Sequence, residues 1–280
     1  KLKWGLSAAG YLDPDIFKFY QTHGLNVLSG YGMTEAAGGI TMTPPAEYVI
    51  DSVGTALPGI TLKIADDGEL CLKGSYVTKG YYKEDDADVF VDGWFHTGDI
   101  FKEKDGHYFI LDRKKDIYKN SRGQTIAPQK IENLFQDFDS VQSIFLVGDG
   151  REFNTVLIYP DTKNSPINIE TADTQTIRDL YSSMILSVNS FLSPFERIVN
   201  FVIIKRDFSA EKGELTPKET FNRKNVLKNF AHIIEPLYEK NYVPLHSGSK
   251  EIRVPNWLLR EIGTVRTNVG WDGQKVSIKG

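Results

Sequence analysis

The sequence predicts an α/β and antiparallel β region followed by a small α+β unit. Three observations support this fold class. A strand-helix-strand pattern opens the chain, apolar strands joined by Asp-Gly turns follow from about residue 50, and a basic stretch at residues 113–115 precedes a region of helices and strands. We therefore expect one domain at 1–112, a second at 113–230, and a C-terminal extension of unknown role at 231–280.

The first segment is expected to form a parallel strand-helix-strand unit. Asp13 is a suitable helix N-cap, Pro14 fits the first helical turn, and Gly24 fits the end of the helix. Residues 25–28 are mostly apolar, as in a buried parallel strand. They lead into a glycine-bearing loop at residues 29–35, and ligands of open α/β sheets bind beyond the carboxyl ends of strands.

Antiparallel hairpins are expected next, and a mixture of helices and strands after them. The hairpins turn at Asp67-Gly68 and at Asp105-Gly106, each between short runs with alternating apolar residues. The elements expected beyond the basic stretch are a helix from Pro128, strands at 143–148 and 154–159, an amphipathic helix at 173–192, a strand at 200–205, a helix at 226–238, a short helix at 257–262 and a strand at 275–279.

Composition limits the classes of protein that fit. The chain has 280 residues, a formal net charge of -4 and 40% hydrophobic residues, so it gives no overall attraction to nucleic acid or to an anionic membrane surface. Its single cysteine, Cys71, excludes an intramolecular disulfide framework and is interpreted as a buried thiol in a reducing compartment. No apolar run approaches the roughly 20 residues that span a bilayer. We expect a cytoplasmic protein without a transmembrane segment.

The segment Tyr31-Gly32-Met33-Thr34-Glu35 gathers residue types that nucleotide sites use. Glycines let backbone N–H groups approach a phosphate, the tyrosine ring can stack on a base, and the Thr34 and Glu35 oxygens suit Mg²⁺. A simple glycine turn is the alternative interpretation of this segment taken alone.

Two further segments carry polar groups next to expected turns. Asp99 ends the segment 93–99, where its carboxylate could accept both hydroxyls of a ribose. Within that segment, His96 is interpreted as a turn-stabilising residue in preference to a catalytic one, because its neighbours in the sequence are apolar aromatic residues. The basic stretch around Arg113 is either solvated surface or a source of cations for phosphates, since a guanidinium recognises such groups in a bidentate manner.

Together, these three segments resemble the motifs of the adenylate-forming superfamily, which includes acyl-CoA synthetases, adenylation domains and firefly luciferase. Residues 30–35 resemble the family's adenylate-binding loop, and residues 93–99 resemble its ribose-binding aspartate motif. Residues 112–115 resemble its hinge. Residues 7–14 are similar to a small-residue strand end that borders the adenine and acyl sites in long-chain acyl-CoA synthetases. The resemblance runs from about residue 3 to about residue 228.

The resemblance implies a role for individual residues. Tyr31 is implied to stack on adenine, Asp99 to hold the ribose, and Glu35 to bind Mg²⁺. Thr34 and Glu35 are implied in catalysis, and Lys115 is implied as the hinge residue. The residues implied in ATP or AMP binding are Gly10, Gly30, Tyr31, Gly32, Thr34, Asp99 and Arg113. The residues implied on the CoA or pyrophosphate side are Lys119, Ser121, Arg122 and Gly123.

Two departures from the family pattern are visible. The family's glycine-rich Ser/Thr phosphate loop is absent, so the chain is interpreted as a fragment that is inactive by itself. Residues 213–217 resemble the approach to the family's C-terminal catalytic lysine, but Thr220 and Asn222 stand where that lysine is expected. Lys218 is our candidate for its replacement, with Lys224 as the alternative.

The function implied for the intact protein is activation of a carboxylic acid, of the fatty-acid class, to acyl-AMP and its transfer to CoA. ATP, Mg²⁺ and CoA are the implied cofactors, and membrane-derived fatty acids are a candidate source of the acid. No nucleic-acid partner is expected. The alternatives are a fatty acyl-AMP ligase, an adenylation domain that loads a carrier protein, or a non-catalytic homologue that binds a nucleotide or a partner.

Overall fold

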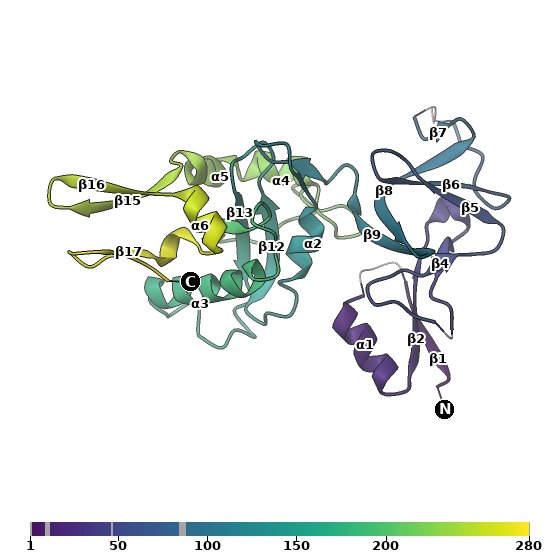
Figure 1. Cartoon of the computed structure of the whole chain (residues 1–280), viewed down its shortest axis with the longest axis horizontal. Coiled ribbons are helices and arrows are strands. Elements are labelled where there is room, and N and C mark those ends of the chain that lie inside the picture. Colours follow the sequence, from purple (N-terminus) through teal and green to yellow (C-terminus); the bar gives the residue numbers. More distant parts are fainter. Residues whose placement is uncertain (1, 9–11, 46, 84–87, 280) are drawn as a thin grey trace. The chain divides into compact units, whose positions relative to one another are not determined.

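The computed structural model describes residues 2–8, 12–45, 47–83 and 88–279 (Figure 1). The chain divides into two compact units, Lys1–Lys115 and Asp116–Gly280. Each unit has its own buried apolar core. Within the described ranges, no helix is both long enough and apolar enough to cross a bilayer.

The first unit opens with the predicted parallel strand-helix-strand motif. The helix begins where the Asp13 carboxylate accepts two backbone N–H groups of the first turn, and it ends shortly before Gly24, whose φ of 74° favours glycine. The first sheet consists, in spatial order, of β1 (Trp4–Ser7), β2 (Asn26–Tyr31), β3 (Thr41–Met42) and β4 (Thr55–Ala56), with α1 (Pro14–Thr22) joining the parallel strands β1 and β2.

A second, antiparallel sheet completes the first unit and contains both predicted hairpins. Asp105 and Gly106, in the second hairpin turn, have φ values of 53° and 80°, as in the two-residue turns that join antiparallel strands. Leu70 and Leu72 on the central strand are fully buried. The strands, in spatial order, are β5 (Ile60–Ile64), β6 (Glu69–Gly74), β8 (Trp94–Lys104) and β7 (Phe90–Val91), with β9 (His107–Arg113) also paired to β8.

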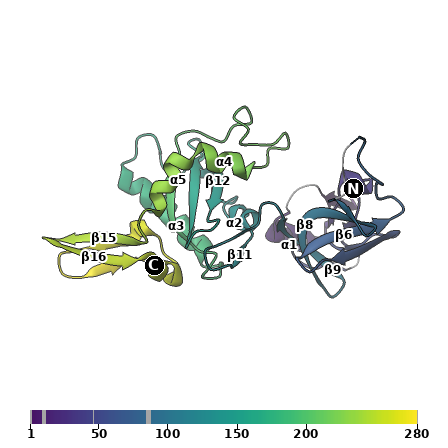
Figure 2. The same ribbon diagram turned by 90° about the horizontal axis from the view of Figure 1, so that it is seen from above.

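The second unit is built around a three-stranded sheet in the order β12-β13-β14, with one antiparallel and one parallel pair. Its elements are β10 (Tyr118–Lys119), β11 (Thr125–Ile126), α2 (Pro128–Asn133), β12 (Val141–Val147), β13 (Asn154–Pro160), α3 (Thr174–Asn189), β14 (Ile198–Ile203), α4 (Arg223–Asn229), α5 (Ala231–Tyr238), β15 (Tyr242–Ser247), β16 (Lys250–Pro255), α6 (Asn256–Ile262), η2 (Arg266–Asn268), β17 (Val269–Trp271) and β18 (Val276–Ile278). In Figure 2 strand β12 of this sheet lies among the helices α2, α3, α4 and α5.

Alternation along β12 places apolar side chains on both faces of this sheet. Ile144 and Leu146 face the core that α2 and α3 cover, whereas Phe145 and Val147 face the core that α4 and α5 cover. The predicted amphipathic helix is confirmed as α3, and Asp173 caps it by accepting two backbone N–H groups. The sheet is therefore buried on both sides.

The single helix predicted at 226–238 is wrong in one respect, because the structure has two helices there. Phe230 separates α4 from α5 with a ψ of 9°, which interrupts the helical hydrogen-bond ladder. Its ring is buried and lies 5.4 Å from that of Phe208. The break thus accompanies the packing of Phe230 into the core.

The last part of the chain packs within the second unit. Ile234 of α5 belongs to the same core as Phe145, and Leu259 of α6 packs with Val199 of β14. The short helix and the final strand predicted there are confirmed as α6 and β18. A separate extension at 231–280 stays a prediction.

Candidate functional site

The loop predicted at residues 29–35 is wrong in extent, because residues 29–31 belong to β2. The turn that follows leads into the short 3₁₀ helix η1 (Thr34–Ala36). Gly32 packs directly against backbone, because a Cβ placed on it would lie 1.4 Å from the carbonyl oxygen of Gly38. A Cβ on Gly30 would lie 3.0 Å from the carbonyl oxygen of Thr41. The loop therefore requires glycine at position 32 for its own folding, whatever it binds.

Asp99 lies in a bulge of β8. Between two paired positions of the β6–β8 ladder, β6 contributes only Leu70, whereas β8 contributes Thr97, Gly98 and Asp99. Gly98 has a φ of 72°. The Thr97 hydroxyl donates to the Leu70 carbonyl at 2.8 Å and accepts from the Asp99 N–H at 3.1 Å. Because a bulge re-aims the side chains of its strand, these residues determine where the Asp99 carboxylate points.

The structure brings Tyr31, Asp99 and Arg113 together. The Tyr31 hydroxyl donates to Asp99 Oδ2 at 2.5 Å, and Arg113 Nε lies 3.8 Å from Asp99 Oδ1. Burial raises the pKa of Asp99, while the Tyr31 hydroxyl and the Arg113 guanidinium act in the opposite direction. Burial, followed by the negative charge of Asp99, also raises the pKa of Tyr31. Tyr31 is therefore a hydrogen-bond donor at neutral pH.

Glu35 lies close in sequence to Tyr31 but has a different partner. The Tyr81 hydroxyl donates to Glu35 Oε1 at 2.7 Å, and the Thr78 N–H donates to the Glu35 carbonyl at 2.7 Å. Neighbouring Thr34 is exposed. Among the described residues, no group of three or more His, Cys, Asp or Glu side chains is arranged to hold a metal ion. A magnesium ion at Glu35 would thus rely on substrate phosphates for further oxygens, as is usual for this ion.

The predicted loop at 93–99 is wrong in extent. The turn precedes Trp94, and residues 94–99 already belong to β8. His96 is therefore a strand residue and stabilises strand pairing instead of a turn. Its Nδ1 lies 2.8 Å from the Glu69 carboxylate on β6. Cys71 is buried, as predicted.

The residues predicted on the CoA or pyrophosphate side belong to the second unit. Lys119 is exposed on β10, and residues 121–123 form an exposed turn in which Gly123 has a φ of 77°. The buried Asn120 side chain accepts the N–H groups of Arg122 and Gln124, each at 3.0 Å. The turn therefore has a fixed backbone and exposed side chains.

Lys218 also belongs to the second unit and is exposed on a small hairpin. Backbone bonds from Thr216 N–H to the Thr220 carbonyl and from Asn222 N–H to the Glu214 carbonyl close this hairpin, each at 2.8 Å. The Thr216 and Thr220 hydroxyls are 2.8 Å apart. Thr220, at one of the two positions where a lysine was expected, is thus engaged within the hairpin.

Gly10 lies outside the described residues, and Lys115 is the last residue of the first unit. Sequence reasoning missed Glu69, Lys114 and Tyr81 as neighbours of the site. The one available signal was a carboxylate at the start of an otherwise apolar strand, in Gly68-Glu69-Leu70.

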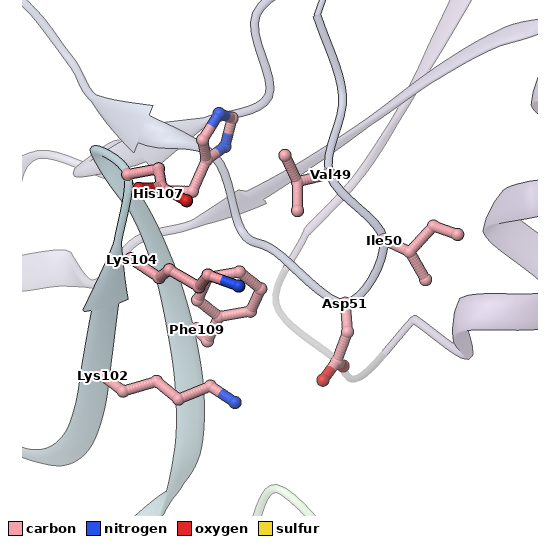
Figure 3. Close-up of a pocket in the computed structure, with 8 residues that line it drawn as sticks. Val49, Ile50, Asp51, Lys102, Lys104, His107 and Phe109 are labelled. Carbon is pink, nitrogen blue, oxygen red and sulfur yellow. The ribbon is translucent and has the colours of Figure 1, made fainter.

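A separate hollow of about 410 Å³ lies on the first unit, away from these groups (Figure 3). Val49 and Ile50 line one side and Lys102, Lys104 and Phe109 line the other. The lining includes none of the predicted nucleotide-binding residues, so this hollow is not the predicted nucleotide site.

Comparison with known families agrees with the resemblance. Residues 1–82 match the AMP-binding enzyme family, and residues 115–242 match the AMP-binding enzyme C-terminal domain. The chain belongs to this adenylate-forming enzyme family.

Individual relatives extend the comparison. The long-chain-fatty-acid–CoA ligase FadD15 of Mycobacterium tuberculosis is 34% identical over 237 residues, which cover 79% of this chain and 40% of the relative. Long-chain-fatty-acid–CoA ligase 6 of Homo sapiens is 33% identical over 262 residues, covering 83% of this chain and 38% of the relative. The chain thus spans about 40% of the length of the curated relatives that it matches.

Solved structures with the same fold are adenylate-forming enzymes. The adenylation domain of a carboxylate reductase from Mycobacterium chelonae has a TM-score of 0.69 and 25% identity, over 84% of this chain and 38% of that one. O-succinylbenzoate coenzyme A synthetase from Bacillus subtilis, in complex with ATP and a magnesium ion, has a TM-score of 0.61 and 21% identity, over 79% of this chain and 46% of that one.

Proposed function

We propose that the protein containing this chain is an acyl-CoA synthetase. It would activate a carboxylic acid, of the fatty-acid class, with ATP to give acyl-AMP and pyrophosphate, and then transfer the acyl group to CoA with release of AMP. The observation that carries this proposal is the bulge that presents Asp99 between the Tyr31 hydroxyl and the Arg113 guanidinium. Family membership and the names of the relatives support it.

The geometry suits an adenosine phosphate in two respects. An ionised carboxylate only accepts hydrogen bonds, so Asp99 can receive both hydroxyls of a ribose. Tyr31 stands beside it, and an aromatic face can stack on the attached base. Arg113 adds a cation whose side chain is 44% exposed and can therefore reach a ligand. In this proposal these residues contribute by alignment of the nucleotide.

The second part of the proposal concerns charge. Attack of a carboxylate on the α-phosphorus moves negative charge onto the departing pyrophosphate, and nearby cations stabilise that charge. Glu35 is partly exposed and fits as a protein ligand for magnesium, whose contribution there is neutralisation of phosphate charge. We propose that groups of the second unit approach the phosphates or CoA, namely Lys218, Lys119 and the turn at 121–123.

We also propose a cytoplasmic location for the protein. The free buried thiol of Cys71 supports this location, because free thiols are usual in reducing compartments.

The decisive experiment is the Asp99→Ala variant of the intact protein. Loss of two hydrogen bonds to a charged acceptor, each worth about 1.5 kcal/mol or more, should raise the KM for ATP at least tenfold. The assay is acid-dependent exchange of pyrophosphate into ATP. Asp66→Ala is the matched control, because Asp66 is an exposed carboxylate on the same unit. An unchanged KM in Asp99→Ala would refute the assignment of the ribose.

A second candidate function is loading of a carrier protein in place of CoA. The similarity to carboxylate reductase adenylation domains, one of them solved together with its carrier domain, favours this alternative. Offering CoA and a phosphopantetheinylated carrier protein to the same acyl-AMP separates the two acceptors.

A third candidate function is that of a non-catalytic nucleotide binder. Thr220 and Asn222 at the expected lysine position favour it. That candidate requires calorimetric binding of ATP with magnesium and no acid-dependent exchange.

A further inference from the structure

A buried carboxylate lies behind the bulge that carries Asp99. Glu69 begins β6, its side chain is 4% exposed, and three donors surround it. Its oxygens lie 2.8 Å from the Gly98 N–H, 2.8 Å from His96 Nδ1 and 2.8 Å from Lys114 Nζ. Burial disfavours the charge of Glu69, but these hydrogen bonds outweigh that effect and lower its pKa. Glu69 is therefore ionised and only accepts, so His96 must carry its proton on Nδ1.

Lys114 is held from two sides. Besides Glu69, its ammonium lies 2.7 Å from Asp67 Oδ2 in the adjoining turn. Its backbone N–H donates to the Gly98 carbonyl at 2.8 Å. The hydrogen bonds to Asp67 and then to Glu69 raise the pKa of Lys114. We call Asp67, Glu69 and Lys114 the Lys114 clamp.

The clamp holds both sides of Gly98. The Glu69 carboxylate accepts the N–H of Gly98. The backbone N–H of Lys114, whose ammonium is bound to Glu69, donates to the Gly98 carbonyl. Because glycine adopts positive and negative φ with similar ease, the residue itself does not impose the φ of 72° at Gly98, and these two hydrogen bonds help to fix it. Asp99 is the next residue along the chain. The position of the Asp99 carboxylate therefore depends on the clamp.

The clamp also fixes the end of the first unit. Arg113 is the last residue of β9 and its side chain lies near Asp99, whereas Lys114 begins the turn that follows and its side chain contacts Glu69. Lys115 follows at once and is the last residue of this unit. Among the contacts of residues 113–115, the two ion pairs of Lys114 are shorter than that of Arg113, at 2.7 and 2.8 Å against 3.8 Å.

We propose that Glu69 is a positioning residue for nucleotide binding, which acts through the Lys114 clamp. Its carboxylate fixes the bulge that presents Asp99, keeps Arg113 next to Asp99, and sets Lys115 as the first residue free to change conformation. Only the effect of Glu69 on nucleotide binding rests on the proposed function. The restraint on residues 113–115 is a property of the fold and can be measured without any ligand.

The kinetic test compares three variants of the intact protein in the exchange assay. Glu69→Gln and Lys114→Met should each raise the KM for ATP on the order of tenfold, with kcat changed by less than about twofold, because the contact of Asp99 with the nucleotide is weakened equally in the ground state and the transition state, while the reacting groups are untouched. Lys114→Arg keeps the cation and should restore a KM close to that of the parent. Lys104→Met is the matched control, because Lys104 is an exposed lysine of the same hairpin.

The ligand-free test is limited digestion with trypsin, which cleaves after lysine and arginine. Glu69→Gln should increase cleavage after residues 113–115 on the order of tenfold, because local opening becomes easier. Cleavage after the exposed Lys79 should not change and serves as the internal reference. Lys114→Met covers the case in which Glu69→Gln fails to fold, because the Lys114 side chain is 48% exposed in the parent; its cleavage is compared with the parent after Arg113 and Lys115 only, since the variant has no trypsin site at residue 114.

Each outcome decides the inference. A KM at the parent value together with unchanged cleavage in both variants overturns it. A rise in KM and a fall in kcat by similar factors, accompanied by faster cleavage at Lys79, indicate general destabilisation and also overturn it. If the parent protein itself shows no acid-dependent exchange, the proposed function fails, while the digestion still confirms or refutes the clamp.

Discussion

Glu214 offers a quantitative test of how the Lys218 hairpin is held. Its carboxylate is fully buried and accepts four hydrogen bonds. Two come from Arg206 at 2.7 and 2.8 Å, one from the Ser209 N–H at 2.9 Å and one from the Asn229 amide at 2.8 Å. The Arg206 guanidinium in particular lowers the pKa of Glu214 to about 2. Replacing Glu214 with glutamine removes the charge and leaves one carbonyl acceptor.

The expected cost follows from the pKa. A fall from the ordinary value of 4.5 to about 2 corresponds to about 3 kcal/mol, at about 1.4 kcal/mol for each tenfold change in the proton-binding constant. The Arg206 side chain is 37% exposed, so water screens part of this interaction, and the glutamine retains one hydrogen bond. We therefore expect Glu214→Gln to lower the free energy of unfolding of the second unit by about 2 kcal/mol at pH 7.

The pH dependence has a definite sign. Because folding lowers the pKa of Glu214, its stabilising effect is present above pH 4.5 and is lost as the pH falls towards 2. Urea unfolding read by tryptophan fluorescence measures it. Substituting Trp4 and Trp94 with phenylalanine leaves Trp257 and Trp271 as reporters of the second unit.

The matched control is Glu211→Gln, because Glu211 is an exposed carboxylate three residues upstream. It should change the unfolding free energy by less than about 0.5 kcal/mol. A difference between parent and Glu214→Gln that is as large at pH 3 as at pH 7 would refute the electrostatic reasoning. A difference under about 0.5 kcal/mol at pH 7 would show that the hairpin does not depend on this carboxylate.

Two further predictions concern the loop and the hinge. Gly32→Ala should destabilise the first unit by about 3 kcal/mol, because its Cβ would lie 1.4 Å from the Gly38 carbonyl oxygen. Thermal unfolding tests this, with Gly5→Ala as the control because a Cβ at Gly5 meets only an ordinary contact. Equal melting temperatures of the two variants would contradict the prediction. Lys115→Pro should leave pyrophosphate exchange within about twofold and slow thioester formation about tenfold, and equal loss of both half-reactions would exclude a hinge at this residue.

The elements that could be predicted are those specified by local chemistry. The first helix begins and ends where Asp13 and Gly24 indicate, because a cap needs one side-chain acceptor and a left-handed residue needs no Cβ. The hairpin at Asp105-Gly106 follows from the same kind of information, since two adjacent residues with positive φ specify the turn. Such signals are complete within a few residues of the chain.

The bulge at Asp99 could not be predicted in this way. Its existence depends on the register between β6 and β8, which places Leu70 opposite three residues of a strand about thirty positions further along. The same register buries Glu69, although a carboxylate after an Asp-Gly turn is ordinarily exposed. The sequence therefore identified Asp99 as a polar group of interest but not the residues that hold it.

The two units each contain the same kind of arrangement. In each unit, a buried glutamate with a lowered pKa accepts hydrogen bonds from several donors and so fixes a nearby backbone segment. Glu69 does this next to Asp99, and Glu214 does it in the hairpin that carries Lys218. Ionised carboxylates suit this task because one group can receive bonds from a backbone N–H and from cations at once. A short loop with few apolar side chains gains from this a single conformation. Hydrophobic packing alone would not hold it to better than an ångström, and alignment of a nucleotide requires that accuracy.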